Sequence, residues 1–393
     1  MKLFKSLLVA PATIGLLAPL STFAGEANLK DISNYSNLEH IDLANAFVND
    51  EPNDTPLLAG GEGLVDGPSN GGGFSETTTA SFSTDMYLGA VDGGTVKTDD
   101  TVMAGYSFQI DLNTTFTGED SLDISIDSGN AGSAGIAEFD GNSASTSLTV
   151  DGVSYTFPIG AKTTAFVGDS TDGSLLFNTA CVYSGPSNTL DDCGNNYSAI
   201  NAGAGTAFGA SYDVGNGLAF AFGYTGSNTG LMTEDGDDAI ATQVSYIADS
   251  YGVSLTYADK ENPTFTQTVT DATVWGLNGY YTPSSEGLPS ISVGFEFGDA
   301  EIPALTPADT DTSSWFVGLQ WDEVGPGTAG VAVGTKQHTV DNATLDDELL
   351  MYEAFYSYNV NDGMTVTPLI FIKEFPAGTT DETGLMVKTS FSF

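Results

Sequence analysis

Acidic side chains are the residues of this sequence with the most evident chemistry. The 393 residues carry 52 Asp and Glu against nine Lys and no Arg, a formal net charge of −43. Such an excess of carboxylates repels anions, so we predict that the chain does not bind nucleic acid or an anionic surface. Two interpretations remain, and both can hold together: a surface adapted to high salt, and a pathway that favours cations.

Catalytic motifs are nearly absent. His40 and His338 stand apart from any Ser or Cys nucleophile arrangement, and no phosphate-binding Gly-Lys-Ser/Thr loop occurs. The acidic run 234–238 offers oxygen ligands of the kind that Ca²⁺ prefers, but it lacks the full calcium-loop spacing, and a solvated loop is the alternative. The sequence therefore predicts no enzyme activity, no cofactor and no resident metal.

Cys181 and Cys193 are the only cysteines, and the N-terminus predicts an oxidising compartment for them. Residues 1–24 have the features of a secretory signal peptide: Lys2 and Lys5, then an apolar run, then a small-residue cleavage site. An even number of cysteines in a secreted chain predicts one disulfide, with two free thiols as the alternative. By the chain-entropy model this bridge contributes ~3 kcal/mol.

Strands must position these residues, because apolar and polar side chains alternate with a period of two from residue 75 onward. In the last stretch, 383–393, Leu385, Val387 and Phe391 alternate with Met386, Lys388 and Ser390. The pattern predicts about sixteen strands, although Asp151-Gly152 is also compatible with a turn. The expected ranges are 78–90, 101–114, 119–127, 146–157, 162–168, 206–214, 217–225, 238–248, 251–259, 272–282, 289–298, 313–322, 328–336, 350–359, 363–373 and 383–393.

Long and short connections alternate between these strands, which is typical of an all-β transmembrane antiparallel barrel with short periplasmic turns and long outer loops. Aromatic residues near strand ends, such as Tyr257, Tyr281 and Trp321, fit interface girdles. A secreted two-sheet sandwich is the alternative. We expect three parts: the signal peptide 1–24, a flexible periplasmic extension 25–74, and the barrel 75–393.

Several motifs resemble those of porins from marine unicellular cyanobacteria, a group related to carbohydrate-selective OprB-type porins and often labelled iron uptake porins. The matching stretches are Tyr-Thr-Phe-Pro-Ile-Gly-Ala-Lys at 155–162, Tyr-Thr-Pro-Ser-Ser-Glu-Gly-Leu-Pro at 281–289, Ser-Trp-Phe-Val-Gly-Leu-Gln-Trp at 314–321, and the terminal Phe393. The sequence departs from that group at 25–74, which lacks the S-layer-homology domain and coiled coil that tether such barrels to the cell wall.

The resemblance implies a protein of the cell outer membrane, in contact with its lipids, through which small ions and solutes diffuse passively, with inorganic nutrients such as iron among them. It also implies a homotrimer. In sixteen-stranded porins the third outer loop folds inward and narrows the channel, and the connection 169–205, which carries both cysteines, occupies the matching place.

We therefore predict a constriction that favours cations through simple charge. Its candidate residues are Asp169, Asp172, Asp191 and Asp192 in this connection, and Asp111, Asp123 and Glu296 in the inward-facing register of the strands. An acidic outer loop stapled against proteases is the alternative for the connection. The absence of Arg disfavours anion and sugar selectivity. The two alternatives to a cation-preferring porin are a carbohydrate-selective porin and a structural barrel without an open pore.

Overall fold

The computed structural model describes residues 77–94, 101–131, 141, 146–187, 190, 193–194, 204–228, 230–233, 237–261, 270–285, 287–303, 309–335, 339–340, 348–376 and 378–392. The chain divides by its internal contacts after Asn70, and every described residue belongs to the second unit, Gly71–Phe393. The predicted signal peptide 1–24, the extension 25–74, both histidines, Asp191, Asp192 and Phe393 lie outside the described residues. Within the described ranges, no helix is long and apolar enough to cross a membrane.

The period-two alternation becomes a set of antiparallel strands, because side chains at alternate positions of a strand point to opposite faces. The strands are β1 (Thr78–Asp92), β2 (Met103–Thr114), β3 (Ser121–Gly129), β4 (Thr149–Ile159), β5 (Thr163–Asp172), β6 (Ala204–Gly215), β7 (Leu218–Gly226), β8 (Asp238–Ile247), β9 (Tyr251–Glu261), β10 (Asp271–Tyr281), β11 (Ser290–Glu301), β12 (Asp309–Val324), β13 (Gly327–Thr335), β14 (Thr339–Val340), β15 (Leu350–Asn361), β16 (Met364–Lys373) and β17 (Glu382–Ser392).

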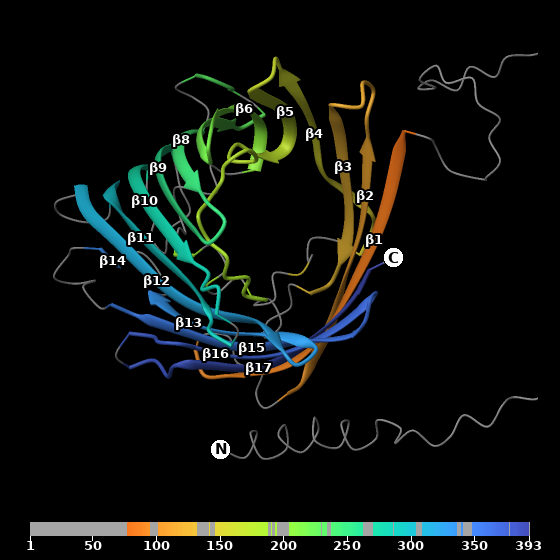
Figure 1. The fold of residues 1–393 in the computed structure, drawn as a ribbon. Helices are drawn as coiled ribbons and strands as arrows, with labels where there is room; N and C mark the ends of the chain where they lie inside the picture. Colours follow the sequence, from red (N-terminus) through yellow and green to blue (C-terminus); the bar gives the residue numbers. More distant parts are fainter. Residues whose placement is uncertain are drawn as a thin grey trace, which may run out of the picture. The chain divides into compact units, whose positions relative to one another are not determined.

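The strands form a closed ring (Figure 1). Consecutive long strands pair antiparallel all the way round, and β1 pairs with β2 on one side and with β17 on the other. β14 is only a two-residue strand, which pairs with β12 beyond the residues that β13 occupies. The predicted sixteen-stranded barrel is confirmed, and the two-sheet sandwich is wrong because a closed ring leaves no free edges.

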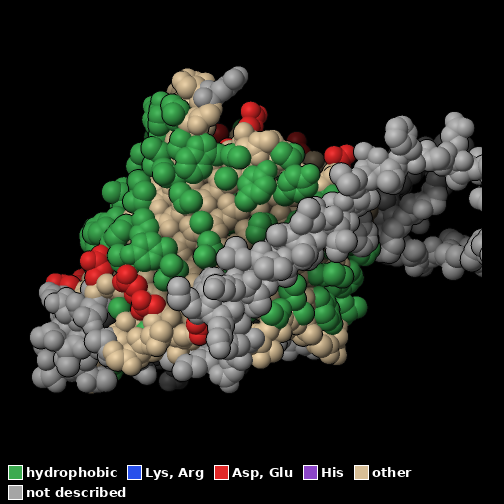
Figure 2. Space-filling model, turned by 90° about the horizontal axis from the view of Figure 1, so that it is seen from below, with side chains coloured by type: hydrophobic (Ala, Val, Ile, Leu, Met, Phe, Trp, Pro, Cys, Tyr) green, Lys and Arg blue, Asp and Glu red, His purple; other side chains and the backbone are tan. Residues whose placement is uncertain are grey.

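The outward-facing side chains form an apolar surface (Figure 2). On β9–β12 the exposed members of this row are Val253, Leu255, Trp275, Leu277, Ile291, Val293, Phe295, Phe297 and Val317. Aromatic residues line up across strands at two levels: Trp275 pairs with Tyr257 and Phe297, and Tyr281 pairs with Tyr251 near the opposite ends of the same strands. The outer wall therefore has an apolar band bounded by aromatic side chains.

The inward-facing side chains are of two kinds. On β8–β11 they are mostly small or polar, as in Gln243, Ser254, Asn278 and Ser292. Around the other side of the ring they join a hydrophobic cluster inside the barrel, which comprises Tyr87, Val91, Ala131, Tyr183, Leu190, Cys193, Phe316, Ala332, Met351, Phe355, Leu369, Phe371 and Met386. Inward-facing side chains in contact with bulk water are seldom as apolar as those of this cluster. The side chains of the cluster therefore fill part of the barrel interior.

Two β-bulges lie in β4 and β5; the first falls inside the strand expected over 146–157, and the second makes the expected end of the next strand, residue 168, wrong. Asp151-Gly152 is not a turn but part of β4, at a register shift opposite Ser125 and Ile126. Strand β5 continues through a second shift, where Ser170 has φ 48°, as far as Asp172. A bulge inserts an extra residue and lets pairing continue beyond it. The connection to β6 therefore spans 173–203 instead of 169–205.

One carboxylate holds the connection 115–120 between β2 and β3. Oδ1 of Asp120 accepts hydrogen bonds from the Thr115 hydroxyl and from the N–H groups of Phe116 and Thr117 at 2.8–2.9 Å, and Oδ2 accepts the Tyr155 hydroxyl at 2.6 Å. The Tyr155 bond is the largest of the causes that hold the pKa of Asp120 well below its usual range; burial opposes it, and the bonds from Thr117 and Thr115 add to it.

Replacement of Asp120 by Asn is expected to loosen this turn at neutral pH. Because the folded-state pKa of Asp120 lies below its unfolded value of ~3.9, its contribution to stability is present above that pH and is lost as the pH falls through the lowered pKa. Amide hydrogen exchange of Phe116 and Thr117 should be several-fold faster in the variant at pH 7, with a difference that shrinks below about pH 4. Equal protection of both amides at pH 7 would contradict this role.

Candidate pore lining

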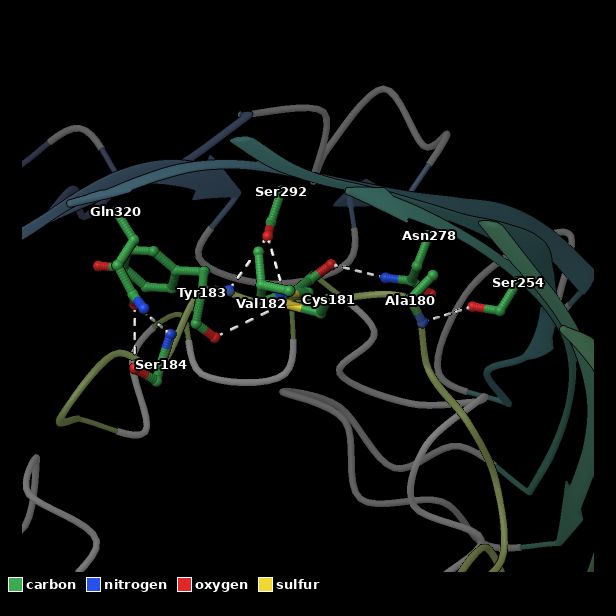
Figure 3. Close-up of a disulfide and its surroundings, with 10 residues drawn as sticks. Ala180, Cys181, Val182, Tyr183, Ser184, Ser254, Asn278, Ser292 and Gln320 are labelled. Carbon is green, nitrogen blue, oxygen red and sulfur yellow. Dashed lines mark hydrogen bonds between the residues drawn. A yellow bond between two sulfur atoms is a disulfide. The ribbon is translucent and has the colours of Figure 1, made fainter. Parts of the chain in front are cut away.

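The described residues of the β5–β6 connection lie inside the barrel, against the inner wall (Figures 1 and 3). We call its described residues, 173–187, 190 and 193–194, the inward loop. Its first limb donates backbone N–H groups to inward-facing side chains of four strands: Asn178 to Gln243 (2.6 Å), Ala180 to Ser254 (2.9 Å), Val182 and Tyr183 to Ser292 (3.0 and 3.1 Å), and Ser184 to Gln320 (2.9 Å). Polar side chains of β8, β9, β11 and β12 thus satisfy the buried backbone of the loop.

The second limb returns across the same wall. The carbonyl oxygen of Cys193 accepts a hydrogen bond from Asn278 Nδ2 at 3.2 Å, and that of Gly194 accepts one from the Ser314 hydroxyl at 2.9 Å. Gly294 of β11 permits this close approach, because a Cβ atom there would overlap the Cys193 carbonyl oxygen. The return limb therefore lies against small strand residues, Gly294 and Ser314.

The disulfide joins the two limbs. The predicted bridge between Cys181 and Cys193 is confirmed, with Cα atoms 6.4 Å apart and Cys193 fully buried. Figure 3 shows it beside the hydrogen bonds of Ala180, Val182 and Asn278. The bridge closes the loop on itself at the place where both limbs touch the wall.

Four carboxylates face inward on the opposite part of the wall, on β1–β3. Register places them at successive inward levels of β2: Asp85 opposite Ser107, Asp127 opposite Gln109, Asp111 itself, and Asp123 opposite Asn113. Because inward positions recur every second residue, this series extends for about 20 Å along the strand. We call Asp85, Asp127, Asp111 and Asp123 the acidic series.

Uncharged groups provide the hydrogen bonds to the acidic series. Asp111 accepts from Gln109 Nε2 and Ser125 Oγ, both at 2.8 Å, and Asp127 accepts from Thr149 Oγ1 at 2.8 Å. Asp123 accepts from Ser121 and Asn113, and Asp85 from Tyr87. Lys388 of β17 also faces inward, opposite Tyr87 and one level beyond Asp85. Neutral partners leave the negative charge of the series in place.

The structure separates the predicted site residues into groups. Asp111 and Asp123 stand together in the acidic series, whereas Glu296 lies on β11 and is fully buried. Asp169 belongs to the outward row of β5, two residues after the exposed Val167, and contacts Thr206 and Asn228. Asp172 accepts the N–H and hydroxyl of Ser174 where the inward loop begins. Asp191 and Asp192 lie outside the described residues.

Sequence reasoning did not assign the partners of the loop. The polar row of β8–β12 lacked a distinctive signal, because Ser, Gln and Asn are ordinary residues for the polar face of a strand. Alternation places Glu353 on the inward face but does not pair it with Tyr183. A signal for the inner cluster did exist: in β16, Pro368, Ile370 and Ile372 face out while Leu369 and Phe371 face in. A strand that is apolar on both faces must be covered on both.

Known structures share this fold. The chain resembles Pseudomonas putida OprB in its high-pH structure (TM-score 0.59, 11% identity, 81% of this chain and 94% of that one). It also resembles an anion-selective porin from Comamonas acidovorans (0.56, 12%, 81% and 99%) and a mutant of the Rh. blastica porin (0.53, 12%, 80% and 100%). No protein-family model and no curated protein sequence matches the chain. These similarities show that the described residues adopt the barrel fold of porins.

Proposed function

We propose that this chain is a non-enzymatic porin of the cell outer membrane that lets small hydrophilic solutes and ions diffuse passively and prefers cations. The observation that carries the proposal is a closed barrel whose outer wall is an apolar band bounded by aromatic residues. A closed barrel pairs every backbone group of its strands within lipid, and an apolar outer surface suits the acyl chains. The predicted signal peptide 1–24 and extension 25–74 fit export across the inner membrane.

The cation preference rests on the acidic series and on the net charge. A carboxylate that accepts hydrogen bonds from hydroxyl and amide groups keeps its charge and attracts cations to its part of the wall. The fold does not decide this property, since the Comamonas acidovorans porin of the same fold is anion-selective by name. The resemblance to cyanobacterial porins extends the proposal to inorganic cations, iron among them, and to a homotrimer.

A structural barrel without an open pore is the second candidate. The inner hydrophobic cluster favours it, because side chains of β12–β17, β1 and the inward loop fill part of the interior. A carbohydrate-selective porin, the third, draws on the structural likeness to OprB, but the chain has no Arg to hold sugars.

Single-channel recording in planar bilayers tests the proposal. Purified protein is expected to give discrete open channels and, across a KCl gradient, a reversal potential of the sign that a cation-preferring pore produces. Open channels that prefer anions would keep the porin and overturn the charge argument. Folded protein that inserts into bilayers without conducting would support the structural barrel.

A further inference from the structure

The inward-facing side chains of the barrel wall are covered on one side of the barrel and exposed on the other. Beneath the inward loop, polar side chains are almost completely covered: Thr256 is 0% exposed, and Ser254 and Ser292 are each 1% exposed. On β1–β3 the inward-facing Asp111 and Asp123 are half-buried, and Ser81, opposite Asp111, is exposed. The loop therefore covers one part of the lumen wall and leaves Asp111 and Asp123 of the acidic series accessible.

The side chain of Tyr183 fixes the middle of the loop. Its ring packs against Phe316 and Phe355, with centroids 5.4 and 5.9 Å away, and its hydroxyl donates to Glu353 Oε1 at 2.6 Å. The hydroxyl of Ser187, four residues further along the loop, donates to Glu353 Oε2. One carboxylate on β15 thus binds the segment 183–187 at two places, one through each oxygen.

We propose that Glu353 is a positioning residue that holds the inward loop as a fixed partition of the lumen. Solutes then pass along β1–β3, and this part of the inference rests on the proposed function. Glu353 is only 3% exposed, and both of its oxygens accept hydrogen bonds from the loop. Loss of either donor would leave a buried acceptor oxygen without that partner, which is costly. The disulfide and the Asn278 and Ser314 hydrogen bonds hold the return limb in the same orientation.

Thiol labelling of the folded protein in detergent tests the partition without requiring any current. A cysteine is introduced either at Thr256, under the loop, or at Ser81, on the uncovered wall, and each is reacted with a cationic methanethiosulfonate. We expect Ser81→Cys to react at least about a hundredfold faster than Thr256→Cys, because the covered thiol reacts only when the loop opens. Equal rates at the two positions would overturn the partition.

The substitution Glu353→Gln then tests the positioning residue. It keeps the shape of the side chain but replaces the carboxyl group by an amide, which has one acceptor oxygen fewer. Labelling of Thr256→Cys should rise about tenfold, equivalent to ~1.4 kcal/mol of loop opening, while labelling of Ser81→Cys stays unchanged. Glu353→Asp, which keeps the charge and both oxygens, should restore part of the protection. A barrel that is merely destabilised would gain reactivity at both positions.

Tyr183→Phe is the second variant, because it removes one bond to Glu353 without altering the strand. Should Glu353→Gln fail to fold, Tyr183→Phe should still raise the labelling of Thr256→Cys. Unchanged protection in a folded variant of either residue would overturn the positioning role.

In bilayers Glu353→Gln should raise conductance with little change in reversal potential. Protein that never conducts would refute the proposed function, while the labelling results would still decide the partition.

Discussion

Replacement of both Asp111 and Asp123 by Asn is expected to lower the preference of the channel for cations at least about threefold. In water-like dielectric an ion ~7 Å from one carboxylate gains ~0.6 kcal/mol, which changes its local concentration roughly threefold. Asn keeps the size of each side chain and leaves amide and hydroxyl partners nearby. The measurement is the reversal potential across a KCl gradient at low ionic strength, where screening extends over a longer distance.

The control removes one carboxylate charge outside the lumen. Asp259 of β9 is exposed and lies in the outward row, two residues beyond Tyr257. Asp259→Asn should leave the cation-to-anion permeability ratio unchanged, because its carboxylate lies on the outer side of the wall. A shift of similar size in both variants would show that net charge, and not the acidic series, sets the preference. An unchanged ratio in the double variant would remove the series from the ion pathway.

Replacement of Gly294 by Ala is expected to displace the inward loop from the inner wall of the barrel. The new Cβ atom would overlap the carbonyl oxygen of Cys193 and approach Asn278 Nδ2 to 3.0 Å, so the hydrogen bond between them cannot persist in its present geometry. Overpacking of this kind costs typically ~1–3 kcal/mol, which raises the population of the open loop roughly 5- to 140-fold. Limited proteolysis of the folded barrel measures this opening as cleavage within 173–203.

Gly279 supplies the matched substitution on the adjacent strand. A Cβ atom there finds its nearest neighbours at 3.4 and 3.8 Å, which are ordinary contact distances. Gly279→Ala should therefore be cleaved at the rate of the unmodified protein. If Gly294→Ala is no more sensitive than Gly279→Ala, the close contact between β11 and the inward loop does not hold the loop in place.

Much of the barrel could be predicted because its determinants are local. Alternation along β9–β12 identified each strand, and the contrast between tight connections such as 216–217 and long ones such as 262–270 set the order of turns and loops. The bulges in β4 and β5 escaped prediction, since one extra residue leaves the apolar pattern on both sides intact. For the same reason Asp169 and Asp172 were expected in a loop but lie in β5.

The sequence by itself determined the strand count, the apolar outer wall and the pairing of Cys181 with Cys193, because alternation and a single pair of cysteines have few solutions. Only the tertiary structure decided which acids stand together. Asp111 and Asp123 join the acidic series through the register of β1–β3, whereas Glu296 is buried on β11 and Glu353 binds the inward loop. Period-two alternation tells which face a side chain occupies; what lies across the lumen from that face depends on contacts between residues more than a hundred positions apart, such as Tyr183 and Glu353.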